Sequence, residues 1–294
     1  MTELEAGLAT IDQWFLTADD GFDLWVREGG AGDPVVAVHG GFGIEHSELV
    51  EPLTVLTETH RVHWYDQRGS IRSPGSSSEQ LESITFDAHV TDLIMLAEEV
   101  GPTILVAHSI GTLIAMAALR RRPDLFREMV LVGAIPATGF SQSLKGQAWL
   151  AQRERQAEAL ISRLGLDSAD LGPREAQLKW RILFASGNAA ADDAWRTIRW
   201  PGRTWYRTEV ADLSDRGVPE SFDFTPELSG HARPVTVIIG DTDYIDFGAE
   251  AWQDIAAITP NVTLRIIDQC GHNPWYDRPE AFRDELLTAV GLDS

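Results

Sequence analysis

The chain has 294 residues, with 44% hydrophobic and 23% charged side chains, which is ordinary for one large globular domain or a domain that carries an insertion. Its formal net charge of −21 argues against nucleic-acid and anionic-membrane partners, because both need a basic surface. No stretch approaches the roughly 18 consecutive apolar residues of a membrane helix, and residues 1–5 lack a basic start, so we expect a cytoplasmic protein without a membrane partner or signal peptide.

Short apolar runs alternate with helical patterns over the first part of the chain. The sequence predicts an opening antiparallel pair, Ile11–Thr17 and Phe22–Arg27, around a turn at Asp19–Gly21. Buried strands and the helices between them are predicted at Pro34–His39, Arg61–Tyr65, Phe86–Glu99, Thr103–Ala107, Gly111–Arg121 and Met129–Val132. Buried strands that are joined by helical crossovers predict a largely parallel sheet with helices on both faces.

The alternation stops after Gly133. Residues 134–230 are richer in Trp, Arg and Gln and show a helical pattern over Gln147–Leu164. Strands and a final helix resume at Pro234–Ile239, Val262–Ile267 and Pro279–Val290. We therefore predict an α/β core formed by residues 1–133 and 231–294, with a helical cap at 134–230. The cap's aromatic side chains either line a pocket or form the cap's own small core: Trp180, Trp195, Trp200, Trp205 and Tyr206.

A serine stands where a buried strand is predicted to end. The strand continues into Ala107-His108-Ser109-Ile110-Gly111, and an apolar helix follows. A serine at the apex of a strand–turn–helix is the context in which G-x-S-x-G marks a nucleophile, although Ala107 replaces the usual first glycine. We predict that Ser109 is a nucleophile, and the simpler alternative is a helix N-cap.

A glycine-rich loop, His39-Gly40-Gly41-Phe42-Gly43, follows the third predicted strand. A phosphate-binding G-x-G-x-x-G counted from Gly41 would need glycine where His46 stands, which argues against that function. We predict instead that the backbone amides of Gly41 and Ile110 form an oxyanion hole.

An aspartate and a histidine follow two later strands. Asp243 comes just after the strand Pro234–Ile239, at the sheet edge where α/β proteins bind ligands. His272 follows the last predicted strand, and its side chain suits proton transfer near neutral pH. The sequence therefore predicts a Ser109–Asp243–His272 triad, with Asp241 and Asp246 as alternative acids.

The remaining residues indicate no metal or cofactor. Cys270 is the only cysteine, so a multi-thiolate site cannot form, and its place at a strand end favours a structural role over a nucleophilic one. No H-E-x-x-H motif occurs. His39 is expected to shape the glycine loop, and His108 to precede the nucleophile without a role of its own. The histidines without metal-ligand spacing, expected at the surface or in the core, are His46, His60, His63, His89 and His231.

These motifs, in the order Ser, Asp, His, resemble an α/β-hydrolase-fold serine hydrolase, and most closely the proline iminopeptidases and their relatives. The resemblance rests on the glycine loop, where that family has His-Gly-Gly-Pro-Gly, and on Tyr65-Asp66-Gln67-Arg68-Gly69-Ser70. It covers roughly residues 10–133 and 231–290 and implies an eight-stranded, mostly parallel sheet. Phe42 replaces the family's proline, and the serine motif departs from its Gly-Gly-Ser-Trp-Gly.

The resemblance implies acyl transfer from a small molecule or a short peptide to water. In such aminopeptidases acidic residues, several of them from the cap, hold the substrate's amino group. The candidate substrate-binding residues are Phe42, Glu45 and Glu209, with Asp212, Asp215 and Glu220 as further cap acids. An aminopeptidase, a carboxylesterase or lactonase, and a ligand-binding receptor of the same fold remain open. The sequence leaves the oligomeric state open as well.

Overall fold

The computed structural model describes residues 12–140, 143–198 and 207–292. Within these ranges one eight-stranded sheet has the order β1-β2-β4-β3-β5-β6-β7-β8. Its strands are β1 (Asp12–Thr17), β2 (Asp23–Gly30), β3 (Asp33–Val38), β4 (His60–Tyr65), β5 (Thr103–His108), β6 (Phe126–Val132), β7 (Val235–Gly240) and β8 (Val262–Ile267). The β1–β2 and β2–β4 pairs are antiparallel and all the other pairs are parallel. The predicted eight-stranded, mostly parallel α/β fold is confirmed.

Helices flank this sheet and fill the segment between β6 and β7. The α-helices are α2 (Val50–Leu53), α3 (Ser78–Glu82), α4 (Phe86–Val100), α5 (Ile110–Arg121), α6 (Leu144–Arg163), α7 (Pro173–Asn188), α8 (Thr208–Ser214), α9 (Thr225–Gly230), α10 (Glu250–Ile258), α11 (Pro274–Asp277) and α12 (Pro279–Ala289). Short 3-10 helices are η1 (His46–Leu49), η2 (Thr54–Glu58), η3 (Pro123–Leu125), η4 (Ala194–Arg196) and η5 (Phe247–Ala249). Among the described residues, none of the helices has the length and apolarity to cross a membrane.

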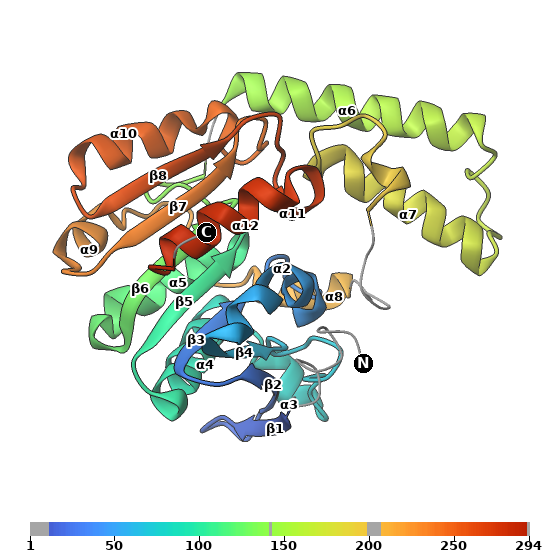
Figure 1. Ribbon diagram of the computed structural model, residues 1–294. Coiled ribbons are helices and arrows are strands. Elements are labelled where there is room, and N and C mark those ends of the chain that lie inside the picture. The colour runs from blue at the N-terminus through green and yellow to red at the C-terminus, as the bar shows by residue number, and fades with distance from the viewer. Residues whose placement is uncertain (1–11, 141–142, 199–206, 293–294) are drawn as a thin grey trace.

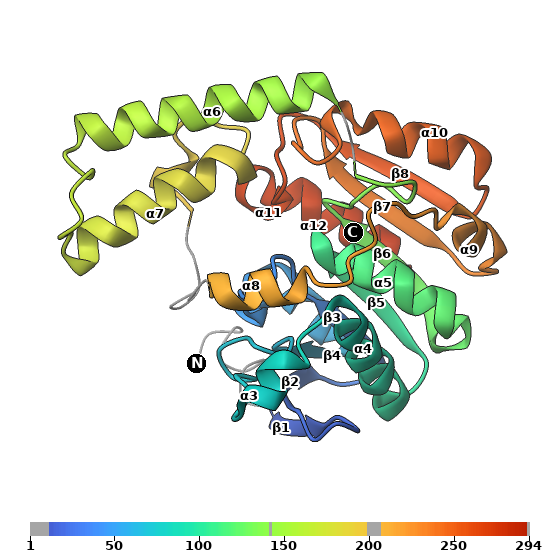
Figure 2. The same cartoon turned by 180° about the vertical axis from the view of Figure 1, so that it is seen from behind.

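Both faces of the central strands are buried, and alternate side chains along a strand pack on opposite faces. On β3, Val36 and Val38 join a cluster with α4, α5 and α10. The intervening Val35 and Ala37 join a second cluster with α2, η2 and α12. Figures 1 and 2 show these two sets of helices on opposite sides of the sheet. Burial on both faces explains the continuous apolar strand runs in the sequence.

The segment between β6 and β7 has its own packing. Helices α6 and α7 lie side by side and extend away from the sheet, whereas α8 lies apart from them (Figures 1 and 2). Trp195 packs against the small α6–α7 cluster that contains Ile161 and Ile182. Trp180 stacks on Phe184 with ring centroids 5.0 Å apart. The aromatic residues that lie outside the described residues are Trp200, Trp205 and Tyr206. Trp195 thus belongs to the segment's own core, and the exact core–cap boundaries stay a prediction.

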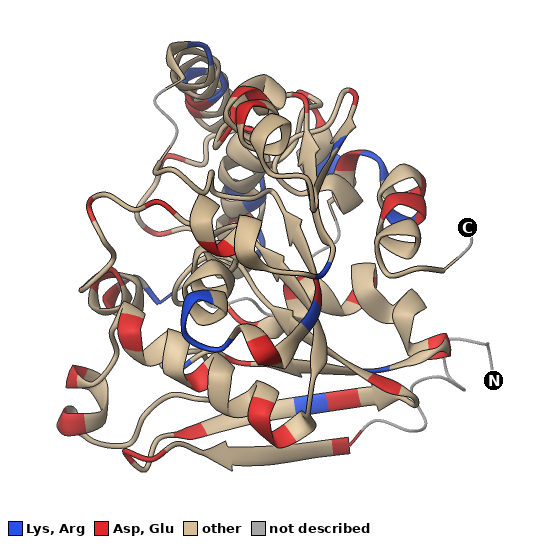
Figure 3. Cartoon of the chain, turned by 90° about the vertical axis from the view of Figure 1, so that its left-hand side faces the viewer, with Lys and Arg blue, Asp and Glu red and all other residues tan. Residues whose placement is uncertain are grey.

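Acidic side chains are spread over many elements rather than gathered in one patch. Figure 3 shows Asp and Glu along the strands and helices in view, with fewer Lys and Arg between them. Several exposed arginines pair with neighbouring acids, as Arg122 does with Glu98 and Asp124. Such exposed pairs contribute little stability each.

Candidate active site

Ser109 lies in the tight turn between β5 and α5. Its backbone has φ 54° and ψ −127°, a strained conformation for a residue other than glycine. The Ser109 amide donates to the Val132 carbonyl at 3.0 Å, and the Thr112 hydroxyl donates to the Ser109 carbonyl at 2.6 Å. Thr112 in turn accepts from the Ile135 amide at 3.1 Å. These bonds hold the strained turn in place.

The two small residues that flank the serine meet different constraints. A Cβ atom at Gly111 would lie 2.7 Å from the His39 carbonyl oxygen, so only glycine fits there without a shift of the backbone. Ala107 instead lies fully buried within β5, in register with Leu131. The departure from G-x-S-x-G at Ala107 is therefore compatible with the turn.

His272 and Asp243 meet Ser109 at the carboxyl ends of β5, β7 and β8. The His272 Nε2 atom lies 2.8 Å from the Ser109 Oγ atom, and His272 Nδ1 lies 3.0 Å from both carboxylate oxygens of Asp243. Asp243 and His272 are both buried. With Nδ1–H donating to Asp243, Nε2 is left to accept the serine proton. A Cβ at Gly133 would lie 2.9 Å from His272 Nδ1, so the lack of a side chain there makes room for the imidazole.

Among the three candidate acids, Asp243 is the one in contact with His272. Asp241 accepts the Cys270 amide at 3.0 Å, and Asp246 accepts the amides of Ala251 and Trp252 at 3.0 Å in the first turn of α10. Both alternatives thus bind backbone rather than imidazole.

The glycine loop packs directly against the serine turn. A Cβ at Gly40 would lie 2.9 Å from the Ser109 Cβ atom. Gly41 follows with φ +49°, and Ile110 is the first residue of α5. Amides at the start of a helix are suited to stabilise negative charge. This arrangement brings together the two segments whose amides, Gly41 and Ile110, are the predicted oxyanion donors.

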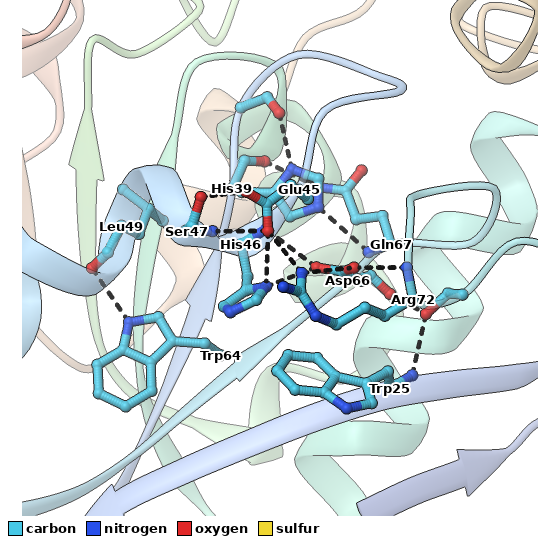
Figure 4. Close-up of polar contacts among 12 residues, drawn as sticks. Trp25, His39, Glu45, His46, Ser47, Leu49, Trp64, Asp66, Gln67 and Arg72 are labelled. Atoms are coloured by element: carbon cyan, nitrogen blue, oxygen red, sulfur yellow. Dashed lines mark hydrogen bonds and ion pairs between the residues drawn. The ribbon is translucent and has the colours of Figure 1, made fainter. Parts of the chain in front are cut away.

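The three candidate substrate-binding residues lie in different environments. Phe42 is buried and stacks on His89, with ring centroids 5.0 Å apart. Glu45 accepts Arg72 Nη1 at 2.8 Å (Figure 4). Glu209 is exposed on α8. The three further candidate cap acids are exposed as well, namely Asp212, Asp215 and Glu220. The described side chains therefore do not form the acidic cluster that the aminopeptidase resemblance implies.

Glu45, His46 and Asp66 have potential metal-ligand atoms within 4.8 Å of one another. These atoms already have protein partners, as Figure 4 shows. Asp66 accepts His46 Nδ1 at 2.7 Å and the Arg72 amide at 2.9 Å. Burial would raise the pKa of Asp66, but the hydrogen bonds and charge of His46 hold it below its usual value. The cluster is therefore better suited to anchoring the chain after β4 than to holding a metal.

Cys270 is buried beside the histidine loop. Burial raises the pKa of its thiol, and the nearby charges of Asp277, Asp243 and Asp241 raise it further. Because only a thiolate is a good nucleophile, this residue is suited to packing and not to catalysis.

Glu48 and His108 are the polar residues beside the triad that sequence reasoning missed. His108 Nδ1 lies 2.5 Å from Glu48 Oε1, and both side chains are buried. Asn273 donates to the same oxygen at 3.2 Å. A buried histidine between the strand and the serine needs a polar partner. This requirement was the one signal in the sequence that His108 has a buried hydrogen-bonding partner.

The chain matches a known family over most of its length, and it has named relatives. The model of the α/β hydrolase fold family matches residues 33–279. The strigolactone esterase RMS3 of Pisum sativum is 33% identical over 115 residues, 38% of this chain and 42% of that protein. The AB hydrolase superfamily protein YclE of Bacillus subtilis is 22% identical over 90% of this chain and 93% of its own length.

A solved structure extends the comparison to the whole fold. The proline iminopeptidase-related protein of Thermus thermophilus superimposes with a TM-score of 0.69 at 25% identity, covering 96% of this chain and 97% of that one. The predicted resemblance to this group is confirmed. With the family model spanning most of the sheet and its loops, the chain belongs to the α/β hydrolase fold family.

Proposed function

We propose that this chain is a serine hydrolase that transfers an acyl group through Ser109 to water. The observation that carries the proposal is the continuous contact from Asp243 through His272 to Ser109, with 3.0 Å and 2.8 Å separations. The strained serine backbone supports it, because strain of this kind is commonly retained at functional sites.

Acylation begins when Ser109 Oγ attacks the substrate carbonyl carbon and its proton passes to His272 Nε2. The carbonyl π electrons move to oxygen, where the amides of Gly41 and Ile110 stabilise the negative charge. Asp243 orients His272 and stabilises the imidazolium. When the tetrahedral intermediate collapses, the bond to the leaving group breaks and His272 protonates that group, which leaves an ester on Ser109.

Deacylation repeats these steps with water. His272 accepts a proton from water as the water oxygen attacks the acyl carbon. The bond to Ser109 Oγ then breaks, the proton returns to that oxygen, and the carboxylic acid leaves. The net reaction adds one water across the acyl bond and regenerates the enzyme.

The substrate class we favour is a small ester or lactone. Recognition of an amino terminus requires carboxylates beside the serine, whereas Glu45 pairs with Arg72 and Glu209 is exposed. Relatives named strigolactone esterase and putative carbamate hydrolase are consistent with this preference. An aminopeptidase is the second candidate, favoured by the likeness to the proline iminopeptidase-related structure.

A substrate panel tests the proposal. We expect short acyl esters or lactones to be hydrolysed with kcat/KM at least tenfold above that of prolyl and other aminoacyl anilides, and the Ser109→Ala variant to lose this activity. Preference for the anilides would reverse the choice of substrate. Ligand binding without turnover of any member would favour the receptor alternative and contradict the enzyme proposal.

A further inference from the structure

A second histidine–carboxylate pair lies behind the triad. Glu48 comes from η1 after the glycine loop, and His108 is the last residue of β5, directly before Ser109. Their side chains are each 3% exposed, and Glu48 Oε1 lies 2.5 Å from His108 Nδ1. The pair is outside the Ser109–His272–Asp243 contacts that carry the proposed chemistry.

The other side of His108 faces His272. His108 Nε2 lies 3.3 Å from the His272 carbonyl oxygen, and the two imidazole rings have centroids 4.8 Å apart. Trp275 covers His108 in an edge-on contact at 4.8 Å. Asn273, the residue after His272, donates its side-chain amide to Glu48 Oε1. The pair therefore contacts the histidine loop at two consecutive residues.

The Glu48–His108 arrangement needs one more proton than a neutral imidazole carries. A neutral imidazole has one N–H, but His108 faces a carboxylate at Nδ1 and a carbonyl oxygen at Nε2, both of which are acceptors. Both contacts become favourable only when the pair holds two protons, and this gives Glu48 and His108 together a net charge of zero. Burial would raise the pKa of Glu48, but the charge and hydrogen bonding of His108 hold it below its usual value, which favours the ionised carboxylate.

The surrounding groups make the charge of this pair consequential. His39, at the end of β3, and Tyr276, on α11, lie within electrostatic range of Glu48. Asp243 contacts His272, and the Tyr244 ring lies 5.0 Å from its imidazole. A Cβ at Gly40 would lie 2.7 Å from His108 Nδ1, so the glycine loop closes over the pair without room for a side chain. Little water can screen a charge placed there.

We propose that Glu48 and His108 are positioning residues: a buried, proton-sharing pair that holds the His272 loop and keeps the space behind the triad electrically neutral. The proposal rests on the proposed function only in assigning His272 the role of the base. In the neutral pair the charge of Glu48 is cancelled, so it does not stabilise the imidazolium of His272. Removing His108 alone leaves the Glu48 carboxylate uncompensated, whereas removing both partners restores neutrality.

The test measures the pKa of the His272 imidazole by NMR titration, with its resonance assigned from a His272→Gln spectrum. In His108→Gln the unpaired Glu48 carboxylate should raise the pKa of His272 by about one unit. In Glu48→Gln the pair holds no carboxylate, so the His272 value should stay close to that of the wild type. The double variant should return to the wild-type value.

The matched control is Glu28→Gln. Glu28 also pairs with a buried histidine, His63, at 3.2 Å. This second pair lies on strands β2 and β4, beside Gly32 and Pro34. This variant should leave the His272 titration unchanged. An unshifted His108→Gln, or a double variant that keeps the shift, would overturn the proposal.

The NMR readout separates this proposal from the proposed function. If the titration shifts as expected and the acid limb of the kcat/KM profile shifts with it, both are supported. If the titration shifts but the rate profile does not, the positioning pair stands and the role of His272 as the base is wrong.

Discussion

The strand-end loops of the sheet and the segment between β6 and β7 build the site in different ways. The loops supply side chains that are buried and paired, such as Asp243 and His272. The inserted segment meets those loops through backbone hydrogen bonds as well as side-chain contacts such as Phe184 against Tyr276. Arg207, just before α8, donates its amide to the Gly43 carbonyl at 3.1 Å, and Asn273 of the histidine loop donates to the Asn188 carbonyl at 3.0 Å.

This contrast between the loops and the inserted segment indicates where we expect chemistry and substrate choice to be encoded. The two halves of the insertion dock on different loops of the candidate site, α8 on the glycine loop and the end of α7 on the histidine loop (Figures 1 and 2). Chemistry depends on residue types at fixed strand ends, which a sequence pattern shows. We expect substrate choice to depend on how the insertion covers those ends, and backbone contacts of that kind leave no residue-type pattern.

The largest expected effect separates the triad acid from its neighbour. Asp243→Asn should lower kcat by about 10³–10⁴, because the amide no longer stabilises the productive tautomer and the imidazolium. Steady-state kinetics with the best ester of the panel measures this loss. Asp241→Asn is the matched control and should stay within about tenfold of wild type, since Asn can still accept the Cys270 amide. Equal losses in both variants would contradict the assignment.

Gly43→Ala tests the docking of α8 on the glycine loop. The new Cβ would lie 2.4 Å from the Arg207 carbonyl oxygen at a φ of +82°, so the free energy of unfolding should fall by about 3 kcal/mol. Chemical denaturation measures the change. Gly217 has nearly the same φ, +84°, with nothing within 4 Å of its Cβ position. Gly217→Ala should therefore cost about 1 kcal/mol, and equal costs would show that the contact contributes nothing.

A smaller effect comes from the histidine that anchors α8. His89 Nε2 lies 2.9 Å from the Ser214 hydroxyl oxygen, and burial, with the charge of Arg68, lowers the pKa of His89 to about 3. The unfolded chain binds this proton near pH 6.5, so stability is lost as the pH falls below that value. Between pH 7 and pH 5 the wild type should lose about 2 kcal/mol more than His89→Gln in denaturant unfolding. Parallel losses would exclude His89 as the cause.

The central strands could be predicted well because both of their faces are apolar, as in β5 and β7. The edge strand β8 is more exposed, yet its run of β-branched and apolar residues still marks it. Val262–Ile267 is β8 with the predicted ends. The predicted Met129–Val132 is too short, because β6 begins at Phe126 and continues through the polar Arg127 and Glu128. These two side chains are only partly buried, and they interrupt the apolar pattern between Phe126 and Met129.

The proximity of Ser109, Asp243 and His272 could be predicted because each comes shortly after the end of a strand, but the residues behind them could not. Glu48 lies in a short 3-10 helix within a loop, where a charged residue is normally exposed. Its burial results from contacts with His108 and Asn273, far away in the sequence. Glu45 is similar, because its Arg72 partner belongs to another loop. Such pairings depend on the tertiary structure, which a local sequence pattern does not specify.

The central claim, that Ser109 is the nucleophile, is tested most directly by labelling with a fluorophosphonate and locating the adduct by peptide mass spectrometry. We expect one adduct, on Ser109, in the wild type. We expect no adduct in Ser109→Ala and strongly slowed labelling in His272→Gln. Undiminished labelling of Ser109→Ala, or an adduct on another residue of the wild type, would contradict the assignment of Ser109 as the nucleophile.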